Sequence, residues 1–221
     1  MKAVLFFSTI LFSFTCWGSF FPSTIDNKQQ LKSTQKRNLV LDTPEFILDF
    51  ERKMSPLVNA QGGILEIFVS SEQSMNAKAT REQFDGKELW LIEIYQGLLA
   101  SENLTEDEIL LVLCHELGHH LAGPPTAQRG GWASCEGQAD YWATANCFRQ
   151  VVRSDVSVEK TSLNLTTHYS QLSFKSPPSL NRRSTTEVQR INYGYPAPQC
   201  RLDTLLAEHY GDKRPNCWFV E

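Results

Sequence analysis

Two short polar motifs in an apolar stretch constrain this chain more than any other feature. The first reads His-Glu-Leu-Gly-His at residues 115–119, and the second reads Glu-Gly-Gln-Ala-Asp at residues 136–140. On a helix, His115 and His119 are one turn apart, so both imidazoles lie on one face. Residues 109–113, just before them, are all apolar. Polar groups in such surroundings need partners, so we expect the two motifs to meet in space.

The residue types in the two motifs are those of a zinc site. A helical His-Glu-x-x-His is the signature of zinc hydrolases, and a catalytic zinc takes three protein ligands and one open position. We therefore predict one zinc ion per chain, held by His115, His119 and Glu136. Glu116 is expected to be the general base for a zinc-activated water, and Asp140 to orient a ligand histidine through its other ring N–H. Two surface helices with charged faces are the alternative, and the apolar flank disfavours it.

The helices that carry the motifs have marked ends. Thr105–Glu108 fits a capping box with acidic residues in the first turn, and Gly123-Pro124-Pro125 fits a stop, which predicts a helix over residues 106–121. A second helix is predicted over residues 134–153. The link between them is short, so the second helix can fold back onto the first. Gly118 lowers helix propensity but permits the close approach of another element.

The other segments predict an α+β domain with a small mixed sheet. A buried strand is predicted at residues 64–70, because apolar residues of this segment lie on both faces of a strand. Another strand is predicted at residues 88–94. Residues 76–81 fit an edge strand. Helices are predicted at residues 44–54 and 198–209, and the Ser/Thr-rich stretch 154–193 shows no element except a short helix start at 184–187.

The N-terminus has the pattern of an export signal. Lys2 is followed by an apolar run to Phe14, which predicts a signal peptide over residues 1–18. A polar leader then covers residues 19–42, and one zinc metallopeptidase domain covers residues 43–221. The chain is thus expected in the periplasm or outside the cell, with two alternatives: a retained membrane anchor at the N-terminus, or lipidation at Cys16. The net charge is −4 and no basic stripe is present, which argues against nucleic-acid binding.

Five cysteines follow the predicted signal peptide, and an odd number leaves at least one thiol free. We predict that the free one is Cys114, which lies in the apolar part of the predicted helix over residues 106–121. Cys135 and Cys147 cannot pair within one helix, where about 18 Å separates them and a disulfide allows roughly 7 Å between Cα atoms. Either Cys200 pairs with Cys217, or Cys135 or Cys147 is tied to the C-terminal segment.

Several motifs together resemble one family. Asn76–Thr80 is similar to an Asn-Ala-x-Ala edge strand, and Leu91–Leu99 to a strand that ends in a Gly-Leu-Leu turn. Thr105–Glu108 resembles the acidic start of the metal helix, and Glu136–Asp140 fits Glu-x-x-Ala-Asp. These are features of the gluzincin metallopeptidases of the HtpX and CAAX-prenyl-protease type, here in a small exported, BepA-like form. The resemblance covers residues 64–207 and implies a zincin-like fold with a two-helix zinc site.

The family's late His-Pro-x4-Arg-Ile motif has two counterparts in this chain. One is Tyr195-Pro196 followed by Arg201, and the other is Ser176-Pro177 followed by Arg182. The first implies that the Tyr195 hydroxyl stabilises the oxyanion, with Tyr193 as the nearby competitor, and that Arg201 fixes this segment. The chain departs from the family in two respects: no histidine precedes either proline, and the link between the two zinc motifs is short.

The preferred function is an exported zinc-dependent endopeptidase that acts on a peptide or an unfolded protein, bound as an added strand along residues 76–81. One alternative, from a different class, is a binding or chaperone-like module for envelope proteins that keeps zinc for structure. A third reading is a zinc hydrolase with a substrate other than a peptide.

Overall fold

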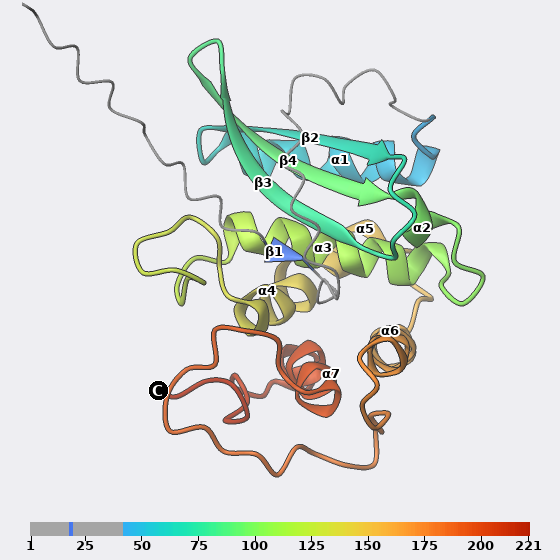
Figure 1. Ribbon diagram of the computed structural model, residues 1–221, viewed down its shortest axis with the longest axis vertical. Helices are drawn as coiled ribbons and strands as arrows, with labels where there is room; N and C mark the ends of the chain where they lie inside the picture. The colour runs from blue at the N-terminus through green and yellow to red at the C-terminus, as the bar shows by residue number, and fades with distance from the viewer. Residues whose placement is uncertain (1–17, 20–41) are drawn as a thin grey trace, which may run out of the picture.

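The computed structural model of the protein describes Gly18–Ser19 and residues 42–221. Helices pack around a small mixed sheet, as the α+β prediction requires (Figure 1). The sheet and its helix α1 form the top of the view, α3 and α4 the middle, and α6 and α7 the bottom. Apart from Gly18, the predicted signal peptide lies outside the described residues. Among the residues that are described, none of the helices has both the length and the hydropathy to span a membrane.

The sheet has the strand order β1-β3-β4-β2. β2 (Gly63–Ser70) is parallel to β4 (Lys87–Tyr95), whereas β3 (Ala77–Phe84) is antiparallel to β4. The short β1 (Gly18–Ser19) pairs antiparallel with β3. Asp85 and Gly86 join β3 to β4 with φ angles of 50° and 73°, the positive values that a tight two-residue hairpin turn favours. All three strands expected from the sequence are confirmed, with slightly different ends.

Helix α1 (Glu45–Asn59) packs on β2 and is longer than predicted. Its buried stripe is Ile47, Phe50, Met54 and Val58, which continues the helical spacing by one turn beyond residue 54. Pro56 lies inside this last turn. It removes one backbone donor, but its own carbonyl still accepts a hydrogen bond from the Ala60 N–H at 3.1 Å. Burial of Val58 therefore outweighs the stop signal that the proline gives.

The two motif-bearing helices follow β4 and the short α2 (Gln96–Leu99). Helix α3 (Glu106–Leu121) has the predicted bounds and the predicted capping box, in which the Glu108 carboxylate accepts from the Thr105 N–H at 2.9 Å. The predicted second helix is three consecutive pieces: α4 (Glu136–Trp142), the π-helix η2 (Ala143–Phe148) and α5 (Arg149–Val151). Single π-helical turns inside α-helices are frequent at functional sites.

Helix α6 (Val158–Leu172) occupies the stretch in which no element was predicted. Its buried face carries hydroxyl side chains, and that of Thr166 donates to the Ser162 carbonyl at 2.7 Å. The Ser170 hydroxyl likewise donates to the Thr167 carbonyl at 2.7 Å, whereas the buried Ser162 hydroxyl has no such partner among the described residues. Because hydroxyl side chains can bond to carbonyls of their own helix, polar residues occupy the core-facing side of α6 and it shows little hydrophobic periodicity. Helix α7 (Pro198–Ala207), continued by η3 (Glu208–Tyr210), confirms the last predicted helix. Residues 184–187 are not helical.

Candidate metal centre

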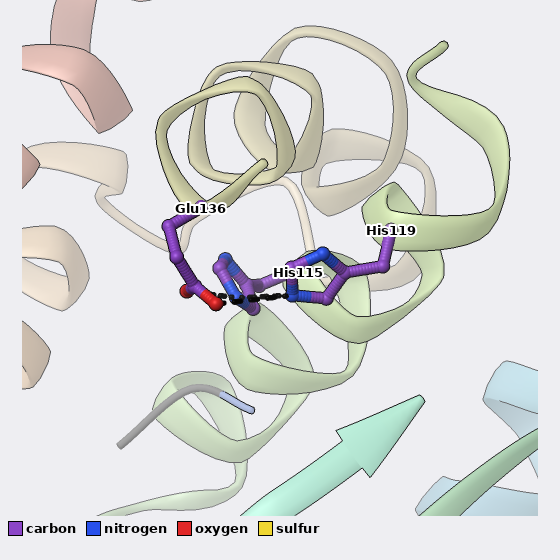
Figure 2. A group of neighbouring side chains, drawn as sticks. All are labelled: His115, His119 and Glu136. Carbon is purple, nitrogen blue, oxygen red and sulfur yellow. Dashed lines mark hydrogen bonds and ion pairs between the residues drawn. The ribbon is translucent and has the colours of Figure 1, made fainter. Parts of the chain in front are cut away.

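Three side chains from two helices converge on one point (Figure 2). His115 and His119 project from α3, and Glu136 is the first residue of α4. The two Nε2 atoms are 3.1 Å apart. The Glu136 carboxylate lies 3.3 Å from Nε2 of His115 and 3.8 Å from Nε2 of His119. All three side chains are buried, and within residues 42–221 and Gly18–Ser19 they form the one group of this kind that could hold a metal ion.

The two helices can approach closely because Gly118 lacks a side chain. A Cβ atom at this position would lie only 2.9 Å from the Ala139 carbonyl oxygen and 3.0 Å from its Cα. The link between the helices adds backbone hydrogen bonds: the Ser134 N–H donates to the His119 carbonyl at 3.0 Å, and the Cys135 N–H to the Pro125 carbonyl at 2.8 Å. The close approach expected at Gly118 is confirmed, and it brings Glu136 to the histidine pair.

The other ring nitrogen of each histidine is held by a fixed acceptor. Nδ1 of His115 lies 2.8 Å from an Asp140 carboxylate oxygen, and Nδ1 of His119 lies 2.8 Å from the Ser134 carbonyl oxygen. Both acceptors favour a proton on Nδ1, so each ring presents an Nε2 lone pair when it is neutral. Two imidazole lone pairs and a carboxylate within 4.8 Å of one another repel unless a proton or a metal ion lies between them. This donor set therefore fits a metal ion.

Asp140 is held in turn by a buried arginine. The Arg201 guanidinium donates to both Asp140 oxygens, from Nε at 2.7 Å and from Nη2 at 2.6 Å, and neither side chain is exposed to solvent. Burial alone would raise the pKa of Asp140, but the charges of Arg201 and His115 lower it to about 2. The carboxylate thus stays ionised and keeps the His115 ring in place.

The two histidines of this group differ in their protonation. Burial lowers the pKa of both rings. At His115 the Asp140 carboxylate and Glu136 outweigh burial and raise the pKa to about 9. At His119 burial dominates, because its Nδ1 partner is a neutral carbonyl, and the pKa falls to about 4. His119 is therefore neutral at pH 7, whereas a metal ion must replace a proton at His115, and metal binding releases protons.

Two residues that support the site were missed in the sequence. Ser134 acts through its backbone carbonyl, so its residue type carries no signal. Tyr169 lies on α6, and the Arg201 guanidinium stacks over its ring with 4.8 Å to the ring centre. Its position, four residues after the buried Leu165, is a helical spacing that could have indicated a core-facing residue. The Ser/Thr-rich surroundings obscured it.

Of the two late segments considered from the sequence, the one with Arg201 reaches the site. Arg182 instead lies at the surface, where it donates to the Pro177 carbonyl at 2.7 Å and to Gln199 at 3.1 Å. Tyr195 is half-buried in the loop before α7. It adjoins Pro196, whose carbonyl accepts from the Tyr169 hydroxyl at 3.4 Å. The loop is thus tied to the residue that stacks on Arg201, and the oxyanion role of Tyr195 stays a prediction.

Tyr195→Phe, which removes only a hydroxyl, tests that role. A lost oxyanion donor typically lowers kcat by roughly 10²–10³-fold, while metal content and KM should stay nearly unchanged. The measurement is steady-state cleavage of an unfolded protein substrate. Tyr193→Phe is the matched control, because Tyr193 is half exposed and lines a surface hollow formed by residues 188–193, which contains no ligand residue. Wild-type kcat in Tyr195→Phe would exclude the role.

His120, the residue after His119, is buried in a stack of rings. Its imidazole lies between Trp90, with ring centres 5.3 Å apart, and Trp132, at 4.8 Å. The Arg81 guanidinium donates to the His120 carbonyl at 3.1 Å and to Nδ1 at 3.3 Å. Burial, assisted by the charge of Arg81, lowers the pKa of His120 to about 3. Through Arg81 of β3 and the Leu91 carbonyl of β4, the neutral His120 ring and its backbone link the sheet to the C-terminal end of α3.

The cysteine pairing corrects one prediction and confirms another. Cys114 is not free: it forms a disulfide with Cys147, with Cα atoms 5.6 Å apart. Cys114 precedes His115 by one residue, so it is rotated about 100° around the helix axis from that side chain. It therefore faces η2, which packs on α3. Cys200 pairs with Cys217, which is one of the two alternatives that the sequence left open. Among the described cysteines the free thiol is the buried Cys135, whose pKa burial raises to about 11. Two disulfides are typical of a protein from an oxidising compartment.

Comparisons with family models, curated proteins and solved structures gave no match for this chain.

Proposed function

We propose that this chain is an exported zinc-dependent endopeptidase with a zincin-like fold of the gluzincin type. The observation that carries the proposal is the convergence of two imidazole Nε2 atoms and one carboxylate, with a further acid, Glu116, beside the first ligand. Three nitrogen and oxygen ligands are the set that catalytic zinc sites use, whereas structural sites usually close all four positions. Glu116 is fully buried on the same helix, where a carboxylate without a chemical role would only cost stability.

In the proposed reaction His115, His119 and Glu136 hold the ion. Bound zinc supplies Lewis acidity, which polarises the scissile carbonyl and lowers the pKa of water. The Glu116 carboxylate accepts a proton as the water oxygen bonds to the carbonyl carbon. It then donates that proton to the amine nitrogen as the C–N bond breaks. Asp140 and Arg201 keep the His115 ring in one orientation throughout, because both are buried and fully paired with each other.

The proposed substrate is a peptide or an unfolded protein, and the proposed location is the periplasm or the cell exterior. Two disulfides support the location, and so does the export-signal pattern of the N-terminus. The net charge of −4 gives no reason to expect a nucleic-acid partner. Membrane association through the N-terminus is the alternative for the location.

Metal removal tests the function directly. The chain, with its disulfides formed, should bind one zinc ion and cleave reduced, carboxymethylated ribonuclease. A chelator should abolish cleavage and added zinc should restore it. His115→Ala and Glu136→Ala should each lack zinc in metal analysis.

Two results would contradict the proposal. Full zinc occupancy in both ligand variants would exclude the site. Tight binding of the unfolded ribonuclease without cleavage, at one zinc per chain, would instead favour the binding or chaperone-like module.

A further inference from the structure

The outer edge of β3 carries a segment from the N-terminal part of the chain. One edge of β3 pairs with β4 along its whole length, from Ala77 to Phe84. On the other edge lies β1, antiparallel, with Gly18 opposite Ala79 and Ser19 opposite Lys78. Within the described residues this is the one pairing on that edge. Gly18 and Ser19 precede the domain's first helix by more than twenty residues, yet they complete its sheet.

This pairing takes place beside the metal helix. Arg81 fixes the register of β3 on α3, because its guanidinium donates to the carbonyl of His120, the residue that follows the ligand His119. Ala79 and Lys78 lie two and three residues before Arg81, which is about 7–10 Å along a strand. β1 also contacts α3 itself, and Figure 1 shows it between β3 and α3.

The β3 edge is a ready template for an extended chain. The Lys78 ammonium is held by the Glu93 carboxylate of β4 at 2.7 Å, so this lysine is anchored to the sheet by a neighbouring strand. Ala79, the partner of Gly18, is fully buried and small. Unpaired N–H and C=O groups on a strand edge bind extended peptides in one orientation by main-chain hydrogen bonds, and Gly18–Ser19 makes such a pairing.

We propose that Gly18–Ser19 occupies the strand edge to which an extended peptide substrate adds, so that the chain competes with its own substrate. The proposal rests on the proposed peptidase function and names its regulation in the chain that still carries Gly18, because signal cleavage after this residue separates the two residues of β1. A strand edge pairs with one strand at a time, so an incoming peptide binds only after the N-terminal segment leaves. The free energy of the β1–β3 pairing then reduces the apparent affinity for every peptide by the same factor.

The test uses the full chain with Glu116→Gln, which binds without turnover. In an antiparallel pair, opposed residues alternate between exchanging two hydrogen bonds and none, so both positions are changed together. Gly18→Pro with Ser19→Pro removes both N–H donors, and Gly18→Ala with Ser19→Ala keeps them as the matched control. Affinity for a fluorescent, carboxymethylated ribonuclease peptide is measured by anisotropy. The proline pair should bind about tenfold more tightly, which corresponds to about 1.4 kcal/mol, and the alanine pair within about twofold of the parent.

Equal affinities in the three chains would overturn the inference. A synthetic peptide with the sequence of residues 15–22 should compete with the fluorescent peptide on the proline variant, while a shuffled peptide should not. Equal competition by both would also overturn it. These outcomes are separate from the function itself: a wild-type chain that binds the peptide but never cleaves it refutes the peptidase and leaves the competition intact. A chain that cleaves, and whose proline and alanine variants bind alike, refutes only the competition.

Discussion

Replacing Glu116 with glutamine should leave zinc binding intact and lower kcat by about 10²–10⁴-fold, the range that a general base contributes. The three proposed ligand atoms come from His115, His119 and Glu136, so the substitution removes none of them. Glutamine has nearly the same size as glutamate, and the position is fully buried, so the packing of α3 should hold. The measurements are zinc content and single-turnover cleavage of reduced, carboxymethylated ribonuclease.

Glu136→Gln is the matched control for this experiment. It makes the same chemical change one helix away, but at a ligand, so zinc affinity should fall together with activity. If Glu116→Gln cleaved at the wild-type rate with zinc bound, the carboxylate would have no part in the reaction. If both variants lost zinc, Glu116 would belong to the metal site rather than to the chemistry.

Asp140→Ala should destabilise the metal-free protein by about 3–5 kcal/mol, because it leaves the buried Arg201 guanidinium without a counter-charge. It should also weaken zinc binding roughly 10–100-fold, since His115 loses the acceptor that orients its ring. Arg201 makes two short bonds to this carboxylate and has no exposed surface. Urea unfolding with both disulfides intact measures the first effect, and competition with a chromophoric chelator measures the second.

A second variant separates the two effects. Asp140→Ala with Arg201→Met removes the stranded charge, so stability should recover by at least half while zinc affinity stays low. The stability difference between wild type and Asp140→Ala should also depend on pH. The pKa of Asp140 is about 2 in the folded chain and roughly 3.9 when unfolded. The contribution of the Asp140 carboxylate to the free energy of unfolding is therefore present above about pH 4 and disappears as the pH falls through 2. A loss below 1 kcal/mol in Asp140→Ala at pH 7 would contradict the argument.

The parts of the structure that were predictable are those with local signals. The capping box at Thr105 and the Gly-Pro-Pro stop set the two ends of α3 without reference to the rest of the chain. The spacing of four residues between His115 and His119 fixed their common face, because helix geometry alone decides it. Gly118 pointed to a close contact, and the second helix with Glu136 is the contact that it makes.

The parts that were missed depend on which surfaces meet in three dimensions. Cys114 was assigned as free because its apolar helix offered no partner, but the partner comes from the π-helical turn of a different helix. His120 follows His119 in the sequence, but only the packing of Trp90 and Trp132 on its ring shows that it is buried. The support that Ser134 gives to His119 comes from a backbone carbonyl, which any residue type supplies.

The disulfide between Cys114 and Cys147 encloses every residue of the proposed zinc chemistry that lies on α3 and α4. The two cysteines are separated by 33 positions, and the interval contains His115, Glu116, His119, Glu136 and Asp140. In the chain-entropy picture a loop of this size restricts the unfolded state by about 3–4 kcal/mol. When the oxidised chain is unfolded, its three ligands therefore stay at a high effective concentration around one another. In the proposed peptidase, an ion lost during a brief unfolding would therefore be recaptured by ligands held within a small tethered loop.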